Sequence, residues 1–241
     1  MQNLSLDITI PVLNEEHRLE RGITQTLKFL ENSQINHYSI TIADNGSEDG
    51  TEIIAQKLTR RFPEIRFFKT GEKGVGLALK QSWASSRSDL VGYMDVDLAT
   101  DLNHLTTAYK MLHEDKIDIV NGSRLLPGSQ VINRSLTRDI TSVGFNFLLK
   151  FVFGTTFTDG MCGFKFVKKD SYEKLTQMGL DNNEWFFCTE LLIKAELSGM
   201  QIYEVPVRWV DDRDSRVELI KTIGKYSKEI RRLRLEVSRK H

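Results

Sequence analysis

Two aspartates that follow an apolar run are the residues of this sequence best suited to chemistry. The run covers residues 90–94, and Asp95 and Asp97 come directly after it with one residue between them. Such a run predicts a strand buried on both faces, which would deliver both carboxylates to its carboxyl end. Mg²⁺ and Mn²⁺ prefer oxygen ligands and leave positions open for water or phosphate. Asp95 and Asp97 are therefore candidate metal ligands for holding a diphosphate, with a solvated turn as the alternative.

Two further polar clusters follow predicted strands. The sequence NEE at 14–16 comes after a strand pattern at 4–12, and DNGS at 44–47 comes after one at 38–43. In open α/β sheets, ligands bind outside the carboxyl ends of the strands, so three clusters at three such ends predict one shared crevice. The alternative is turn chemistry, because Asn, Asp, Gly and Ser are common wherever a strand ends.

Strand and helix patterns alternate through the first half of the chain. The predicted strands cover residues 4–12, 38–43, 65–68, 90–94 and 117–120. Apolar residues at spacings of three and four predict helices between them. This alternation predicts an α/β fold with a mostly parallel sheet covered by helices on both faces.

The second half of the chain is less regular. Its expected elements are a helix at 134–153, a glycine-containing turn at 159–166, a helix at 184–197, a strand at 201–210 and a final helix. We find no internal repeat or low-complexity linker. One domain over residues 1–215 and a C-terminal helix over 216–241 are therefore expected.

Composition excludes several classes of protein. Lys plus Arg and Asp plus Glu each number 33, so no nucleic-acid partner is expected. Cys162 and Cys188 are too few for a disulfide framework or a zinc cluster, which is typical of a reducing cytoplasm. The first residues enter a strand pattern, so no signal peptide is expected. The most apolar segment, 145–153, is shorter than the roughly 20 residues that span a bilayer, so no transmembrane helix is expected.

Several blocks of the sequence, in one order, resemble glycosyltransferase family 2. PVLNEE, ADNGSEDGT and MDVDL are similar to sequence motifs of this family. The resemblance implies a GT-A fold with a Rossmann-like nucleotide-binding half that binds a nucleotide-diphospho-sugar. DGMCGFKF, NEWFFCTELL and EVPVRWVDDRDSRV resemble the polyprenyl-phosphate branch, the dolichyl-phosphate glucosyltransferases and mannose synthases. The resemblance implies an inverting hexosyltransferase that depends on Mg²⁺ or Mn²⁺ and uses a polyprenyl phosphate as acceptor. UDP-glucose is the favoured donor, and GDP-mannose is the other candidate.

The resemblance also implies roles for the matching residues. Those implied to bind the nucleotide-sugar are Pro11, Leu13, Asn14, Glu15, Asp44, Gly46, Ser47 and Asp95. Those implied to hold the metal are Asp95 and Asp97, and those implied to bind the acceptor phosphate are Arg124, Arg138 and Ser142. Asp97, Arg124 and Asp159 are implied to be catalytic. Trp185 and Glu190 are candidate contacts to the sugar or acceptor, and a surface salt bridge is the alternative for both Arg124 and Arg138.

Two residues depart from the family pattern. Ala99 stands where mannose synthases can carry a further polar metal ligand, so water, Thr100 or Asp101 would have to fill that position. Cys188 stands where many relatives have Asp. The departures leave open a catalytically weak nucleotide-sugar binding module, and a glycan acceptor is a further alternative. A nicotinamide dehydrogenase is disfavoured because the glycines at 71–76 have the wrong spacing for the dinucleotide fingerprint.

The C-terminal helix predicts a way to reach a lipid. Its apolar residues recur at spacings of three and four, at Ile220, Ile223, Tyr226, Ile230, Leu233 and Val237. Its basic residues are Lys221, Lys225, Lys228, Arg231, Arg232 and Arg234. This pattern favours a basic amphipathic helix at the cytoplasmic face of a membrane, and the alternative is a helix packed on the core. The apolar segment 145–153 and a separate membrane-protein partner are other candidate routes to the membrane.

Overall fold

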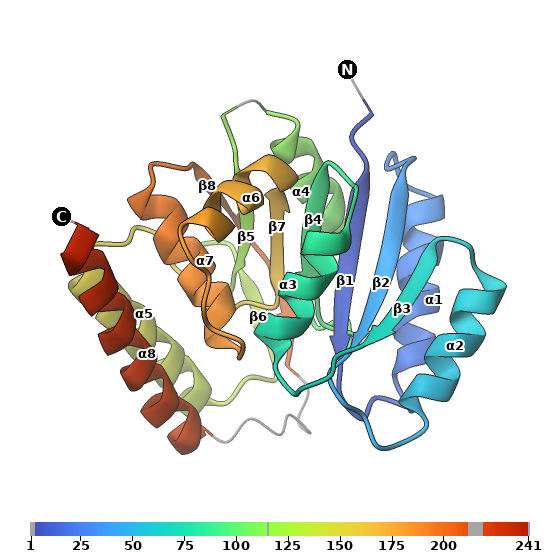
Figure 1. Cartoon of the computed structure of the whole chain (residues 1–241), viewed down its shortest axis with the longest axis horizontal. Coiled ribbons are helices and arrows are strands. Elements are labelled where there is room, and N and C mark those ends of the chain that lie inside the picture. Colours follow the sequence, from blue (N-terminus) through green and yellow to red (C-terminus); the bar gives the residue numbers. More distant parts are fainter. Residues whose placement is uncertain (1–2, 115, 212–218, 241) are drawn as a thin grey trace.

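The computed structural model describes residues 3–114, 116–211 and 219–240, with side chains at all of these except 219–223 and 239–240. A seven-stranded sheet in the order β3-β2-β1-β4-β7-β5-β8 forms its centre (Figure 1). The strands of this sheet are β1 (Leu6–Val12), β2 (Tyr38–Asp44), β3 (Ile65–Lys69), β4 (Leu90–Met94), β5 (Ile119–Ser123), β7 (Phe164–Lys168) and β8 (Ile202–Pro206). β7 is antiparallel to both of its neighbours, and the other paired strands are parallel.

Helices cover both faces of the sheet, and each face has its own apolar core. The helices of the first core are α1 (Leu19–Glu31), α2 (Thr51–Arg61) and α4 (Asn103–Leu112). Those of the second core are α3 (Val75–Ser85), α5 (Leu136–Phe153), α6 (Lys169–Gln177), α7 (Phe186–Leu197) and α8 (Leu219–Lys240). Side chains alternate along the strands, so Leu90 of β4 packs in the first core and Val91 in the second. This arrangement confirms the predicted α/β fold.

Two segments differ from the prediction. The expected turn at 159–166 ends early, and the buried residues that follow it form β7 between β4 and β5. The expected strand at 201–210 is two strands, because the chain changes partner at Val207 after Pro206, which has no N–H to donate. Its second part, β9 (Arg208–Val210), leaves the main sheet and pairs with β6 (Gln130–Ile132).

The apolar face of the C-terminal helix follows the alternative of a helix packed on the core. In Figure 1, α8 lies beside α5 at one end of the molecule. Tyr226, Ile230 and Leu233 of its apolar face are buried in the second core, so this face is not available to a membrane. The other predicted apolar positions at 220 and 223, Lys221 and the expected domain boundary at 215/216 lie outside the described side chains.

No helix among the described residues combines the length and the apolar character needed to cross a bilayer.

Candidate functional site

The loop after β4 carries the two candidate metal ligands. Asp95 is partly buried and Asp97 is exposed. Asp97 Oδ1 accepts a hydrogen bond from the N–H of Ala99 at 2.9 Å, which fixes the turn. α1 approaches this loop through bare backbone, since a Cβ at Gly22 would lie 2.2 Å from the carbonyl oxygen of Val96. The loop at 95–97 therefore packs directly against α1, and Gly22 is required because no side chain fits between them.

The electrostatics of the carboxylate pair fit a divalent cation. Burial, and then the charge of Asp97, raise the pKa of Asp95 to about 7, although Arg124 and Lys165 act in the opposite direction. A hard cation would relieve the repulsion between the two carboxylates. Among the described residues, no group of three or more His, Cys, Asp or Glu side chains gathers as a metal site. Other coordination positions would thus fall to phosphate oxygens and water, the pattern typical of Mg²⁺.

Thr100 and Asp101, the two residues that could replace the missing ligand at Ala99, differ in whether their side-chain oxygens already accept hydrogen bonds. Asp101 Oδ1 accepts from the N–H of Asn103 at 2.9 Å, so its carboxylate serves the start of α4. The buried hydroxyl of Thr100 has no hydrogen-bond partner among the described residues. Thr100 therefore keeps an oxygen that is not committed to the fold.

Gly163, in the turn before β7, lies directly against Asp95 in the loop at 95–97. A Cβ at this position would lie 1.9 Å from Asp95 Oδ2, which no real structure tolerates. The turn therefore needs glycine because the Asp95 carboxylate occupies the space that any side chain would fill.

Replacing Gly163 with alanine is expected to displace Asp95 and weaken binding of Mn²⁺ with UDP by about 10- to 100-fold, the range seen when a group supporting a metal ligand is changed. Mn²⁺ affinity measured by electron paramagnetic resonance checks this. Gly160→Ala is the matched control in the same turn, where the nearest atoms lie 3.2 Å or more from a new Cβ. Equal Mn²⁺ affinities for the two variants would contradict the role of Gly163.

The turns after β1 and β2 are joined by hydrogen bonds at the edge predicted for the nucleotide. Asn14 has a left-handed φ of 56°, donates its N–H to Ser47 Oγ at 2.9 Å and accepts from the N–H of Glu48 at 2.8 Å. The N–H of Glu15 donates to Thr51 Oγ1 at 2.8 Å. Ser47 therefore joins the two turns.

Asp44 is the residue of this edge best suited to bind a ligand. It is fully buried, and its Oδ1 accepts from the N–H of Ser47 at 2.8 Å. Its Oδ2 is buried without a hydrogen-bond partner among the described residues, which is costly unless a ligand donates to it. Gly46 beside it has a φ of 88°, Pro11 pairs with Ala43 one residue before the end of β1, and Leu13 is 40% exposed. The base or the ribose of a nucleotide has the donors that Asp44 Oδ2 lacks.

Arg124 and Asp159 form a bidentate ion pair near Asp95. Arg124 Nε lies 2.7 Å from Asp159 Oδ2, and Nη2 lies 2.9 Å from Oδ1. Burial alone would raise the pKa of Asp159, but the charge and hydrogen bonds of Arg124 lower it to about 2. The Trp209 ring lies 4.9 Å from the Arg124 guanidinium carbon and packs against it. Because both oxygens of Asp159 face Arg124, Asp159 has the geometry of a residue that positions Arg124.

The start of α5 holds the other residues predicted to bind the acceptor phosphate. Arg138 Nη1 lies 2.6 Å from Asp211 Oδ2, so the alternative of a salt bridge holds in this structure. Ser142 is buried, and its hydroxyl oxygen accepts a hydrogen bond from Arg134 Nη2. Asn146 Oδ1, one turn further on, accepts from the N–H of Gly160 at 2.8 Å. This bond ties α5 to the turn that carries Asp159.

The two predicted sugar or acceptor contacts have different surroundings. Trp185 is 45% exposed just before α7 and stays a predicted contact. Glu190 is fully buried, and one of its oxygens lies 3.1 Å from Lys194 Nζ and 3.0 Å from Arg232 Nη2. Its other oxygen accepts from the N–H of Asn182 at 3.0 Å. Glu190 therefore ties α7 to α8, a structural role that differs from the predicted contact.

Two cations at the site were not assigned a role from the sequence. Lys165 of β7 is fully buried, donates to the carbonyl oxygen of Cys162 at 2.6 Å and is among the charges that lower the pKa of Asp95. Its signal in the sequence is a lysine between two phenylalanines of a buried strand. Arg134 opens the helix predicted at 134–153, and its pairing with Ser142 depends on the fold.

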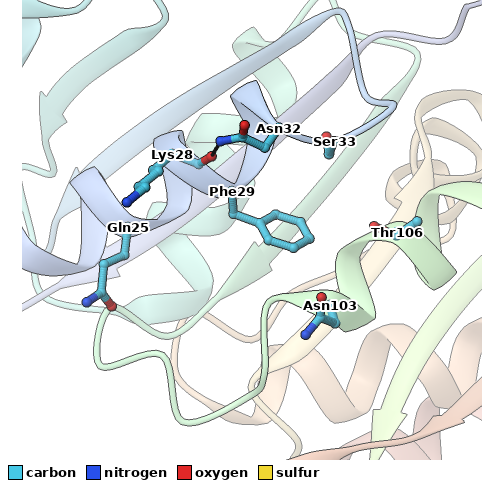
Figure 2. Close-up of a pocket in the computed structure, with 7 residues that line it drawn as sticks. All are labelled: Gln25, Lys28, Phe29, Asn32, Ser33, Asn103 and Thr106. Carbon is cyan, nitrogen blue, oxygen red and sulfur yellow. Dashed lines mark hydrogen bonds between the residues drawn. The ribbon is translucent and has the colours of Figure 1, made fainter.

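A separate pocket of about 490 Å³ lies between α1 and α4 (Figure 2). Its lining residues are Gln25, Lys28, Phe29, Asn32, Ser33, Asn103 and Thr106. Figure 2 shows the Phe29 ring pointing from α1 toward α4. The lining contains one cation and no carboxylate, thiol or imidazole, so its residue types do not match the chemistry of the motifs.

Solved structures show that the chain has a GT-A-like fold. Glucosyl-3-phosphoglycerate synthase from Mycobacterium tuberculosis in complex with Mn²⁺ and UDP-glucose matches with a TM-score of 0.70 at 16% identity, over 96% of this chain and 79% of that chain. The same enzyme with Mn²⁺, UDP and phosphoglyceric acid matches with a TM-score of 0.67 at 17% identity, over 94% of this chain and 76% of that chain. At these identities the likeness establishes the fold.

The chain belongs to glycosyl transferase family 2, whose sequence model matches residues 7–176. The dolichyl-phosphate beta-glucosyltransferase of Drosophila melanogaster is 30% identical over 228 residues, 89% of this chain and 70% of that protein. That of Dictyostelium discoideum is 28% identical over 246 residues, 97% of this chain and 75% of that protein. Glycosyltransferase AglD of Haloferax volcanii is 29% identical over 91% of this chain but only 35% of its own length. The predicted family and its enzyme class, a glycosyltransferase, are confirmed.

Proposed function

We propose that the chain transfers a hexose from a nucleotide-diphospho-sugar to a polyprenyl phosphate, with UDP-glucose favoured over GDP-mannose as donor. The names of the dolichyl-phosphate beta-glucosyltransferases support the acceptor and the sugar. The solved neighbour with Mn²⁺ and UDP-glucose supports the donor and the metal. The observation in this chain that carries the proposal is the buried guanidinium of Arg124. It is fixed by Asp159 and lies close enough to Asp95 to lower the pKa of that residue, so an anion-binding group adjoins the candidate metal site.

The reaction needs positioning more than a strong base. An oxygen of the acceptor phosphate forms a bond to C1 of the hexose while the bond from C1 to the donor diphosphate breaks, and the nucleoside diphosphate leaves with the electron pair. Attack from the opposite face inverts the configuration at C1. The second pKa of a phosphate monoester is about 6, so the acceptor is already an oxyanion at neutral pH. Asp95 and Asp97 would hold Mg²⁺ or Mn²⁺, which would supply neutralisation of the charge on the leaving diphosphate.

The residues of this chain would divide the remaining work between donor and acceptor. Asp44 would accept a hydrogen bond from the nucleotide, in a pocket shaped by Asn14 and Ser47. Arg124 and Arg138 would neutralise the acceptor phosphate, because a planar guanidinium can contact two phosphate oxygens at once. Asp159 would hold Arg124 in the orientation that the acceptor needs.

A transfer assay tests the proposal. Purified protein and Mn²⁺ would be incubated with labelled UDP-glucose or GDP-mannose and a short polyprenyl phosphate, and label extracted into organic solvent would be counted. We expect label from UDP-glucose and none with Asp97→Ala. No lipid-phase label despite tight UDP binding would reject the polyprenyl-phosphate acceptor. It would instead favour a glycan acceptor or a nucleotide-sugar binding module without turnover.

We further propose that the chain meets its lipid acceptor at the cytoplasmic face of a membrane, through α5 and the basic side of α8. One side of α5 packs against α8, where the Phe145 and Tyr226 rings lie 5.3 Å apart. Its outer side carries a row of apolar residues that are 55% to 82% exposed, namely Leu136, Ile140, Val143, Phe147 and Phe151. Exposed cations of α8 are Lys225, Lys228, Arg231 and Arg234. An apolar row beside basic residues is typical of helices that lie in a membrane interface.

Replacing both Phe147 and Phe151 with serine is expected to lower binding to vesicles with anionic lipid by about tenfold or more, because two aromatic rings no longer leave water. Co-sedimentation with the vesicles measures this. Ile53→Ser is the matched control, since Ile53 is an exposed apolar residue of α2 on the opposite face of the sheet. Equal vesicle binding by the double variant and the control would reject α5 as the membrane surface.

A further inference from the structure

Buried N–H donors without partners gather around Arg124. Seven buried side-chain nitrogen or oxygen atoms of the described residues have no hydrogen-bond partner, and only two of them are nitrogens, Arg134 Nη1 and Trp209 Nε1. The Trp209 ring packs on the Arg124 guanidinium at 4.9 Å. Burial lowers the pKa of Arg134, and the charge of Arg124 lowers it further. Arg124 therefore lies close enough to act on Arg134. Both unpartnered N–H groups therefore belong to neighbours of one cation.

Arg134 is held so that one of its nitrogens is left over. Its side chain is only 6% exposed, although it carries a charge. Nε forms an ion pair of 3.1 Å with Asp139 Oδ1, and Nη2 donates to Ser142 Oγ. Nη1 has no partner among the described residues. A buried donor of a charged group costs free energy unless an acceptor meets it, so this arrangement is suited to an anionic ligand.

The bond from Arg134 also sets the direction of a second donor. Because Ser142 Oγ accepts from Arg134 Nη2, the hydroxyl proton of Ser142 points to another acceptor. Ser142 is itself 8% exposed, so its surroundings contain little water. Arg134 thus supplies one N–H and orients one O–H, and Arg134 itself lies near the cation that would neutralise the acceptor.

We propose that Arg134 binds the acceptor phosphate together with Arg124, donating from Nη1 and orienting the Ser142 hydroxyl toward the same anion. This inference rests on the proposed function, and it adds a residue to the set implied by the family resemblance. Two buried guanidinium groups repel each other, and a phosphate dianion with several acceptor oxygens would both relieve that repulsion and use the free N–H groups. A purely structural Arg134 would only fasten the start of α5 through Asp139 and Ser142.

Calorimetric binding of farnesyl phosphate, with UDP as a second ligand, separates these two roles. Arg134→Gln is expected to weaken farnesyl phosphate binding by about 10- to 100-fold, the range for a lost hydrogen bond to a charged group, while the Kd for UDP changes less than about twofold. Arg60→Gln, which changes an exposed arginine of α2, is the control and is expected to match the unchanged protein in both. In transfer assays, KM for the acceptor should rise more than kcat falls.

The outcomes distinguish failure of this inference from failure of the proposed function. If Arg124→Gln loses farnesyl phosphate binding while Arg134→Gln behaves like Arg60→Gln, the role of Arg134 is rejected and the proposed function stands. If the unchanged protein binds UDP but not farnesyl phosphate, the proposed acceptor itself is rejected. Should Arg134→Gln fail to fold, Arg134→Lys keeps the charge and loses the fork. It should still weaken farnesyl phosphate binding severalfold, and binding equal to that of the unchanged protein would overturn the inference.

Discussion

Replacing Asp97 with asparagine is expected to lower metal-dependent sugar transfer by about a hundredfold or more, because one of two charges that hold the cation is lost. Asparagine keeps the hydrogen bond that Asp97 Oδ1 accepts from the N–H of Ala99, so the turn should keep its shape. Removing Asp97 also removes the charge that helps to raise the pKa of Asp95. The change thus acts on cation binding and leaves the loop in place.

Two measurements check the effect of Asp97→Asn. Mn²⁺ affinity in the presence of UDP should fall together with transfer, while the midpoint of thermal unfolding should stay close to that of the unchanged protein. Asp170→Asn is the control, because Asp170 is an exposed carboxylate of α6. Mn²⁺ affinity that is the same in Asp97→Asn and in the control would remove Asp97 from the metal site.

Replacing Arg124 with alanine is expected to lower the free energy of unfolding by about 3–5 kcal/mol, the range for removing one partner of a buried ion pair. Asp159 is fully buried and both of its oxygens face Arg124, so its charge would be left without compensation. Arg138→Ala is the comparison. Its pair with Asp211 is more exposed, so we expect a loss of only about 1 kcal/mol. Urea unfolding of both variants measures the difference, and equal losses would contradict the structural role of the Arg124 pair.

The same pair predicts how stability depends on pH. The pKa of Asp159 is about 2 in the folded protein and about 4 in an unfolded chain. A carboxyl whose pKa is lowered by folding stabilises the protein above its unfolded pKa, so this contribution is complete above about pH 4 and is lost as the pH falls through 2. It amounts to roughly 2–3 kcal/mol. Urea unfolding at pH 6, 4, 3 and 2 should show the loss, and a smaller loss in Asp159→Asn would assign it to this pair.

Kinetics of Arg124 variants separate its proposed role at the acceptor from its structural role. Arg124→Lys keeps a charge beside Asp159 and should fold better than the alanine variant. It loses the planar fork, so the KM for a polyprenyl phosphate should rise more than the KM for the nucleotide-sugar. An unchanged KM for both substrates would remove Arg124 from the acceptor site.

The sequence predicts the first half of the fold well because its signals are local. Apolar runs followed by polar turns place strands within a few residues of their observed bounds, and the polar turns correctly mark the strand ends. β7 was missed because a short apolar run does not specify direction or partner, and the alternation of elements favoured parallel strands. The split of the strand at 201–210 likewise depends on a second pairing, with β6, that no local pattern shows.

Contacts between distant residues account for the rest of the differences. Arg124 and Asp159 were each singled out, but their bond joins positions 35 residues apart. The apolar residues of α5 and of α8 recur at similar spacings. Those of α8 at 226, 230 and 233 are buried, whereas the outer row of α5 is exposed. Amphipathic spacing indicates that a helix has an apolar face, and only packing decides what that face contacts.

The reversed direction of β7 restricts how this protein can be recombined with its relatives. A strand that runs against its neighbours brings its leading turn, rather than its trailing one, to the edge where the other strands end. The turn at 159–163 and the loop at 95–97 therefore come from strands that are hydrogen-bonded to each other. A chimera of two relatives should therefore keep activity only if the turn at 159–163, β7 and a compatible loop at 95–97 are transferred as one block.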